Sequence, residues 1–234
     1  MSILISSHFI DVHAMTNEVS DHARFPVASL VIAGWTGRDK AAVEKHIREL
    51  EELGIARPAS TPIYYRASAA RVTTANSIEA TGTQSSGEVE FVVAQWQGKL
   101  WVGVGSDHTD REVEKYNITV SKQMCDKPVA PSFWTFEDVA DHWDSLVMRS
   151  FIYEDGKRIL YQEGTVASML DPQTLIDGLG DEKKLPEGTM MFCGTFAAKG
   201  GIRPASRFEF EIEDPVLKRK IEHGYDIKTL PVVG

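Results

Sequence analysis

The sequence predicts a β-rich α+β domain, and three observations support this fold class. Short apolar segments separated by turn residues recur along the chain, which is typical of strands. The clearest helical period is confined to residues 40–53, and only short helices are predicted elsewhere. The 234 residues, 42% of them hydrophobic, can bury an ordinary core without disulfides or a structural metal.

The N-terminal part is predicted to contain two strands and the clearest helix. The segments HFIDVHAM (8–15) and VASLVIAGW (27–35) are the strands, with a polar stretch between them. In the helix, Val43, Ile47 and Leu50 recur at helical spacing, and Gly54 then ends it. Residues 1–60 are predicted to be an appended lobe, and residues 61–234 the main domain.

The rest of the chain is predicted to alternate short strands, turns and two short helices. Strands are expected in 63–79, 88–96, 100–105, 158–161, 189–192 and 207–212. The strands 88–96 and 100–105 are predicted to form a hairpin, because a Gly-containing link of three residues joins them. Short helices are predicted at 135–148, with Thr135 as the N-cap, and at 172–178.

Charge and composition exclude several classes of function. The net charge of −9 argues against nucleic-acid binding, which needs a basic face. No apolar run approaches the roughly 18–20 residues of a membrane-spanning helix, and the N-terminus turns polar too early for a secretory signal. Cys125 and Cys193 have no metal-binding spacing and are interpreted as buried or incidental thiols. Two lone cysteines suit a reducing compartment, so a cytoplasmic location is expected.

Two glutamates in GEVEFVVAQW are the first candidates for chemistry. Because strand side chains alternate, Glu88 and Glu90 share one face, with Cα atoms roughly 7 Å apart. The apolar side chains between and after them take the other face. Two carboxylates on one face repel, so they need solvent, basic partners or a cation. A solvent-exposed strand face is the alternative, because Glu-x-Glu is a common tripeptide.

The polar loop SDHTDRE, which follows the second hairpin strand, supplies a third carboxylate. Asp107 is expected at a sheet end, where functional side chains gather, although an ordinary polar turn is the alternative. If the hairpin forms, Asp107 returns near Glu88 and Glu90. Three converging carboxylates suit Mg²⁺, Mn²⁺ or Ca²⁺ and not Zn²⁺, which prefers His and Cys. The adjacent His108 is not counted as a ligand.

Three further features carry less information when each is taken alone. His46 and Glu49 are neighbours on one helix face, so the carboxylate could orient the imidazole; a surface pair is the alternative. Lys122 is a candidate cation, and a solvated lysine is the alternative. The loop 193–201 could hold a carboxylate through backbone amides and the Thr195 hydroxyl; a plain glycine loop is the alternative.

The order of these features resembles the catalytic domain of the fumarylacetoacetate hydrolase superfamily. Its members carry a His-x-x-Glu lid segment, a Glu-x-Glu strand, an Asn-Asp-x-Ser/Thr-x-Arg-Asp loop, a catalytic lysine and a late Gly-Thr-Pro-x-Gly loop. Across about residues 30–228 this sequence has, in the same order, His46-Ile-Arg-Glu49, Glu88-Val-Glu90, Ser106-Asp107-His-Thr109-Asp-Arg111-Glu112, Lys122, Asp155-Gly156 with Gln162, Leu185-Pro-Glu-Gly188, Gly194-Thr195-Phe196 and Phe208-Glu-Phe-Glu-Ile212. The chain is most similar to a divergent, functionally uncharacterised bacterial branch of the DUF2848 type.

The resemblance implies a fold, a metal and a set of residue roles. The fold would be a mixed β-roll, usually a homodimer, with the helical lid ordering over bound substrate. The cofactor would be Mg²⁺ or Mn²⁺, which Ca²⁺ can replace in crystals. The implied roles are metal ligands for Glu88, Glu90 and Asp107, a catalytic water-activating dyad for His46 and Glu49, oxyanion stabilisation for Lys122, and contact with a small-molecule carboxylate substrate for Gln162, Thr195 and Arg111.

The function implied by the resemblance is that of a divalent-metal-dependent enzyme acting on a small keto acid or 1,3-dicarbonyl acid. The reaction would be C–C bond hydrolysis or decarboxylation through a metal-stabilised enolate. One alternative is an isomerase or hydratase of unsaturated keto acids, and another is a non-catalytic metal- or ligand-binding member of the same fold. A third is a β-rich structural or carbohydrate-binding domain in which the motif order is coincidence.

Several features depart from the family pattern. The stretch from Glu90 to Asp107 is shorter than usual, and the predicted lid helix is longer and more regular. Phe196 stands where the family has proline, Ser106 replaces Asn, and Glu112 replaces Asp. The departures leave the substrate less constrained by the sequence than the metal.

Overall fold

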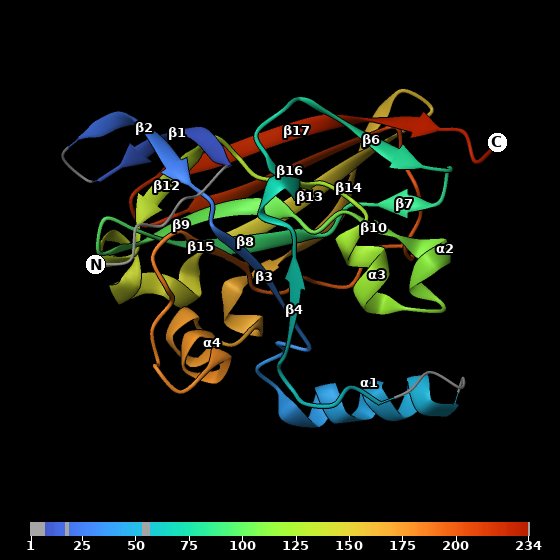
Figure 1. Ribbon diagram of the computed structural model, residues 1–234, viewed down its shortest axis with the longest axis horizontal. Helices are drawn as coiled ribbons and strands as arrows, with labels where there is room; N and C mark the ends of the chain where they lie inside the picture. Colours follow the sequence, from blue (N-terminus) through green and yellow to red (C-terminus); the bar gives the residue numbers. More distant parts are fainter. Residues whose placement is uncertain (1–7, 17–18, 53–56, 234) are drawn as a thin grey trace.

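The computed structural model describes residues 8–16, 19–52 and 57–233, which form two large β-sheets and several short helices (Figure 1). The eight-stranded sheet contains β1 (Phe9–Met15), β2 (Ser20–Pro26), β3 (Ser29–Gly34), β4 (Ile63–Ala67), β8 (Val89–Trp96), β9 (Lys99–Ser106), β12 (Ser132–Thr135) and β15 (Thr189–Phe192). The five-stranded sheet contains β6 (Ser77–Thr81), β13 (Val147–Glu154), β14 (Lys157–Thr165), β16 (Arg207–Asp214) and β17 (Arg219–Leu230).

Two small strand pairs and the helices complete the fold. The small pairs are β7 (Ser85–Ser86) with β10 (Thr109–Asp110), and β5 (Val72–Thr73) with β11 (Lys127–Pro128). The α-helices are α1 (Lys40–Glu52), α2 (Arg111–Glu114), α3 (Ile118–Gln123) and α4 (Pro172–Leu179). Helices α1 and α4 lie on the same side of the sheets in Figure 1. No helix among the described residues is both long and apolar enough to cross a membrane.

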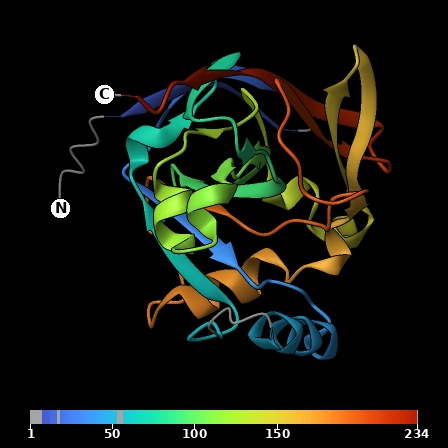
Figure 2. The same ribbon diagram turned by 90° about the vertical axis from the view of Figure 1, so that its right-hand side faces the viewer.

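The eight-stranded sheet has the order β2-β1-β12-β9-β8-β15-β3-β4 and curls upon itself (Figure 2). Its central strand β8 is buried on both faces, which explains the continuous apolar run after Glu90. Val89, Phe91 and Val93 pack into the core shared with the five-stranded sheet. Val92 and Ala94 pack into a second core, formed largely by the other face of the eight-stranded sheet. The two cores therefore flank β8.

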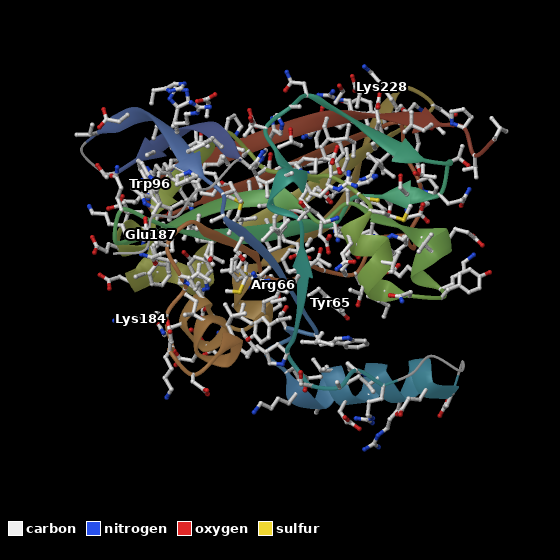
Figure 3. All side chains as sticks on the ribbon, in the orientation of Figure 1. Tyr65, Arg66, Trp96, Lys184, Glu187 and Lys228 are labelled. Carbon is white, nitrogen blue, oxygen red and sulfur yellow. The ribbon has the colours of Figure 1, made fainter. Side chains whose placement is uncertain are left out.

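The β8–β9 hairpin fixes the register that builds the candidate site. Gln97 and Gly98 form its two-residue turn, and both have positive φ, 52° and 72°, as hairpin turns of this length require. Glu187, labelled beside the hairpin in Figure 3, accepts hydrogen bonds from the amides of both turn residues. In the resulting register, Val89 pairs with Ser106 and Glu90 with Gly105. The predicted hairpin is confirmed.

Most of the predicted elements are present. The helix expected at 40–53 is α1, and that at 172–178 is α4, whose N-cap Asp171 accepts a hydrogen bond from the Thr174 amide. The two N-terminal strands, the strands within 63–79, and those at 189–192 and 207–212 are also present. Cys125 and Cys193 are free and buried, as interpreted. The β-rich α+β fold class is confirmed.

Other elements differ from the prediction. Residues 135–148 do not form one α-helix; they form two 3₁₀ segments, Phe136–Asp138 and Ala140–Ser145, followed by β13. Thr135 makes no side-chain capping hydrogen bond. The strands β2 and β17 were not predicted, because their sequences are rich in charged or polar residues. The strand β13 was not predicted, because its apolar residues do not alternate with polar ones and its first two residues were assigned to the 135–148 helix. Strands from before and after residue 60 pair within one sheet, and the lobe boundary there stays a prediction.

Candidate metal centre

Three carboxylates converge where the β8–β9 hairpin ends. Glu88 immediately precedes β8, Glu90 lies within it, and Asp107 immediately follows β9. The Asp107 amide donates to the Glu88 carbonyl at 3.0 Å, which continues the hairpin pairing by one step. One ligand oxygen from each of the three residues lies within 4.8 Å of the others. The local geometry expected from strand alternation and the hairpin is therefore present.

The three carboxylates are not equally accessible. The side chain of Asp107 is fully buried and Glu90 is 2% exposed, whereas the Glu88 side chain is 16% exposed. Solvent therefore reaches the cluster from the Glu88 side. The loop that contains Asp107 is no ordinary polar turn, because residues 106–110 are all buried.

Two lysines approach Asp107 from different elements. Lys122, in the last turn of α3, places its Nζ 2.5 Å from Asp107 Oδ2 and 3.5 Å from Glu88 Oε2. It is nine-tenths buried, so it is not an ordinary solvated lysine. Lys127, which is fully buried, lies 3.3 Å from Asp107 Oδ1 and donates to the carbonyls of His108 and Cys125.

Arg111 occupies the accessible side of the cluster and holds Glu88. Its guanidinium lies 3.1 Å from Glu88 Oε1 and donates to Ser86 Oγ at 2.7 Å and to Glu114 Oε2 at 2.8 Å. With 12% of its side chain exposed, Arg111 is largely committed to these partners. The direct substrate contact implied for Arg111 stays a prediction.

The electrostatics of the site follow from burial and from the distribution of charge. Burial and the negative charge of Asp107 raise the pKa of Glu90 well above its ordinary value. Burial opposes ionisation of Asp107 as well, but Lys122 and Lys127 outweigh it and lower the pKa of Asp107. Burial likewise opposes the charge on Lys122, but Asp107 and Glu88 raise its pKa. Glu90 is thus the carboxylate that most needs an additional cation.

The residues fit a hard divalent cation. The three candidate ligands offer only carboxylate oxygens, the donors that Mg²⁺ and Mn²⁺ prefer. Asp107 Oδ1 is buried and its one close cation among the described residues is Lys127 at 3.3 Å, so this carboxylate oxygen keeps a second lone pair for a metal. Glu90 uses one oxygen to accept from the Gly194 amide at 2.8 Å and has no ion pair with a described residue. Glu88, Glu90 and Asp107 would hold the cation.

The Gly194 loop lies against the metal centre because only glycine fits there. A Cβ at Gly194 would stand 1.8 Å from Thr36 Oγ1, and the residue has a φ of +103°. Thr195 Oγ1 donates at 2.7 Å to the carbonyl of Val89, the residue between Glu88 and Glu90. Phe196, which replaces the proline of the family pattern, packs on Gly164 of β14, where no Cβ obstructs it.

Gln162 ties this loop to β8. Its Oε1 accepts from the Val89 amide at 3.0 Å, and its Nε2 donates to Thr195 Oγ1 at 2.8 Å and to the Phe196 carbonyl at 2.7 Å. Gln162 and Thr195 therefore border the three carboxylates, but their polar atoms are occupied by protein partners. Their implied contacts with substrate stay predictions.

The predicted lid dyad lies on α1, but the side chains of His46 and Glu49 are outside the described part of the structure. The start of α1 is described and is anchored to the fold. Just before the helix, Arg38 makes a bidentate ion pair with Asp144 at 2.8 Å and donates to the Met169 carbonyl. The dyad therefore stays a prediction.

Sequence reasoning missed several residues that surround the triad. Lys127 stands between Asp126 and Pro128, and no local pattern marks it as buried. Tyr225, at the far end of the chain, places its hydroxyl 2.8 Å from Ser106 Oγ and 2.9 Å from His108 Nδ1. Burial, with the charges of Lys127 and Arg111, lowers the pKa of His108 to about 3, so its ring is neutral.

Tyr65 on β4, labelled in Figure 3, is another buried neighbour of the site. It packs into the second core, and burial raises its pKa while the charge of Lys122 opposes that shift. The adjacent Arg66, also labelled, is exposed and donates to Ser29 Oγ. A signal for Tyr65 was present in the sequence as one of two tyrosines in PIYYR.

Comparisons with known proteins agree with the fold. Residues 33–225 match a family described as "Protein of unknown function (DUF2848)". No curated protein matches the sequence. A crystal structure of Cg1458 with inhibitor has a TM-score of 0.66 at 18% identity, covering 90% of this chain and 81% of that chain.

Two further solved structures have the same fold. 2-Keto-3-deoxy-D-arabinonate dehydratase, complexed with magnesium and 2,5-dioxopentanoate, has a TM-score of 0.63 at 17% identity, covering 87% of this chain and 73% of its own. Fumarylacetoacetate hydrolase from psychrophilic Exiguobacterium antarcticum has a TM-score of 0.62 at 15% identity, covering 91% and 82%. At these identities the likeness establishes the fold alone.

Proposed function

This chain belongs to the DUF2848 family, a divergent branch with the fumarylacetoacetate hydrolase fold, and we propose that it is a metal-dependent enzyme acting on a small keto acid or 1,3-dicarbonyl acid. The observation that carries the proposal is the convergence of Glu88, Glu90 and Asp107 within 4.8 Å, with Lys122 beside them. Asp107 has Lys122 and Lys127 beside it and Glu88 has Arg111, but Glu90 is buried without an ion pair to a described residue, which is costly unless a ligand supplies positive charge. Perturbed, converging ionisable groups of this kind are typical of functional sites.

Two of the structural neighbours support the choice of metal and substrate class. The dehydratase complex contains magnesium and 2,5-dioxopentanoate, a keto acid, and another neighbour is a fumarylacetoacetate hydrolase. The oxygen-only donor set of this chain suits the same class of cation. Mg²⁺ or Mn²⁺ is therefore the proposed cofactor.

The chain's own residues would divide the chemistry among them. When bound, a divalent cation supplies Lewis-acid chemistry by drawing charge from the carboxylate and keto oxygens of the substrate. Lys122 keeps its proton in this environment, so its ammonium can stabilise an oxyanion that develops beside the triad. Arg111 and its partners hold Glu88 in place on the accessible side. Thr195 and Gln162 would orient the substrate carboxylate.

The reaction would be C–C bond hydrolysis or decarboxylation, and the role of α1 distinguishes them. In hydrolysis, His46 oriented by Glu49 would take a proton from water that attacks the distal carbonyl. In decarboxylation, the same pair would deliver a proton to the enolate carbon that loses CO₂. Hydration or dehydration of a keto acid is the second candidate, because one neighbour with this fold is a dehydratase.

Metal binding is the first test of the proposal. We expect Mg²⁺ and Mn²⁺ to raise the thermal unfolding midpoint, and oxalate, a mimic of an enolised keto acid, to enlarge the shift. A ligand that binds only the folded protein contributes about 2.7 kcal/mol at 100 times its Kd. Glu88→Ala should lose both shifts. An absence of any metal shift in the wild-type protein contradicts the proposal.

Turnover then separates an enzyme from a binding protein. We expect activity on a panel of acylpyruvates and oxaloacetate, and we expect His46→Ala to lose turnover while it retains the Mn²⁺-induced shift. His13→Ala, at an exposed position of β1, is the matched control and should keep both. Metal binding without turnover across the panel would favour the non-catalytic alternative. The homodimer also stays a prediction, which size-exclusion chromatography with light scattering can check.

A further inference from the structure

We propose that Tyr225 is a positioning residue for the metal ligand Asp107, an inference that rests on the proposed function. Tyr225 is fully buried and comes from β17, near the C-terminal end of the described chain. Its hydroxyl lies 2.8 Å from Ser106 Oγ and 2.9 Å from His108 Nδ1. One phenol therefore contacts the side chains on both sides of Asp107 in the sequence.

The phenol is held by rigid surroundings. Tyr225 pairs with Phe208 of β16, and β17 is hydrogen-bonded on its other side to β6. Its ring packs against Phe208 and Phe210, with centroids 5.8 Å and 6.3 Å apart. The five-stranded sheet thus fixes the hydroxyl, which in turn fixes a segment that follows β9 of the eight-stranded sheet.

The same segment is tied to the other carboxylates. Ser106 Oγ, besides contacting Tyr225, accepts from the Glu88 amide at 3.3 Å. The Asp107 amide donates to the Glu88 carbonyl at 3.0 Å, and Lys127 donates to the His108 carbonyl at 2.6 Å. A shift of the segment would therefore move Asp107 relative to Glu88, and so change the spacing of the carboxylates.

His108 makes the dependence on Tyr225 specific. Its Nε2 is buried and has no hydrogen-bond partner among the described residues. The bond from Nδ1 to the Tyr225 hydroxyl is thus the one that orients the ring within the described chain. Loss of the hydroxyl removes this hydrogen bond, so the buried ring and the adjoining residue Asp107 can shift from their present positions. Partners outside the first ligand shell typically change metal affinity by 10–100-fold in this way.

The test compares two buried tyrosines that each lose only a hydroxyl. Tyr225→Phe is the variant, and Tyr161→Phe is the matched control, because Tyr161 is 1% exposed and its hydroxyl accepts from the Arg203 amide. Mn²⁺ affinity is measured from the EPR signal of the free ion, and the spectrum of the bound ion reports its ligand geometry. We expect Y225F to bind Mn²⁺ at least about 10-fold more weakly, with an altered bound-ion spectrum. Y161F should match the wild-type protein in both.

The inference would be overturned if Y225F had the Mn²⁺ affinity and the bound-ion spectrum of the wild-type protein. If Asp107→Asn abolished Mn²⁺ binding in the same experiment, the proposed function would still stand. If Y225F does not fold, Ser106→Ala removes one of the two contacts of the phenol and should also weaken Mn²⁺ binding. An unchanged affinity in that variant would equally overturn the inference.

A metal-free measurement keeps the inference separate from the proposed function. If the wild-type protein binds no Mn²⁺, the proposed function fails, and urea unfolding of Y225F, D107N and the double variant tests positioning alone. We expect the two changes to be non-additive, because Tyr225 constrains the segment that bears Asp107. Additive changes would overturn the inference.

Discussion

The tripeptide Glu-x-Glu occurs at the start of β8 and within β16, and its surroundings differ between the two places. At the start of β8, Glu88 and Glu90 converge with a third carboxylate at the edge of a buried core. In β16, Phe208 and Phe210 point into the core, and Glu209 and Glu211 lie on the other face of the sheet. On that face, acidic and basic side chains of neighbouring strands form ion pairs. The same sequence pattern therefore produces a candidate metal site in one sheet and an ion-pair ladder in the other.

The difference lies in how many basic partners each carboxylate has. Glu209 accepts from Arg158 at 2.7 Å and from Arg207 at 3.0 Å, and these cations lower its pKa although burial opposes them. Glu90 has no ion pair with a described residue, and burial together with Asp107 raises its pKa. A carboxylate that is buried beside other carboxylates, without its own cation, is the better indicator of a metal site than the tripeptide itself.

The largest expected difference between the two glutamate pairs is the effect of a substitution on Mn²⁺ affinity. We expect Glu90→Gln to weaken Mn²⁺ binding by more than about 100-fold, since loss of a direct ligand exceeds the effect of a supporting residue. Glu211→Gln, the matched change in β16, should leave the affinity unchanged. Isothermal titration of Mn²⁺ into both variants checks the pair. Equal affinities in the two variants would break the comparison, because both pairs would then be ordinary strand faces.

The sequence predicted the part of this comparison that depends on local geometry. Strand alternation and a short turn place Glu88, Glu90 and Asp107 together, and both signals span fewer than two dozen residues of the chain. The helical period of residues 40–53 and the cap of α4 are local in the same sense. The family resemblance rests on the order of the motifs along the chain, and the fold that it implied is confirmed.

The parts that were missed depend on distant contacts or on strands without alternation. Ser106 and Tyr225 meet across 119 positions, and no local pattern connects them. Lys127 is buried only because Asp107 and two carbonyls receive its ammonium. The sequence of β17, RKIEHGYDIKTL, contains few apolar residues, because its charged side chains face the ion-pair ladder and solvent. This segment is recognised as a strand only from its pairing with β16.

The next largest expected difference is the effect of a substitution on the unfolding free energy, compared between the metal centre and the ion-pair ladder of β16. Asp107→Ala leaves Lys127 fully buried without its carboxylate, and breaking a buried pair in this way costs about 3 kcal/mol of unfolding free energy. Glu209→Ala removes a pair at the sheet surface, for which we expect about 1 kcal/mol or less. Urea unfolding at neutral pH, without added metal, measures both. A smaller loss for Asp107→Ala than for Glu209→Ala would show that the buried lysine is satisfied by its carbonyl partners alone.

The smallest expected effect is the pH dependence of the ion-pair ladder. The pKa of Glu209 is lowered in the folded protein, so its contribution is present above the unfolded pKa of about 4.3 and is lost as pH falls through the folded value. The unfolding free energy of the wild-type protein should therefore exceed that of Glu209→Gln by about 1 kcal/mol or less near pH 7. The two unfolding free energies should converge as the solution is acidified below pH ~4.3.

Salt at about 1 M should reduce the difference in unfolding free energy near pH 7, because Glu209 and its arginines are partly exposed. The buried Asp107–Lys127 pair is shielded from salt. A difference that is constant with pH and salt would mean that Glu209 acts through packing, and that the two Glu-x-Glu strands differ in burial but not in electrostatics.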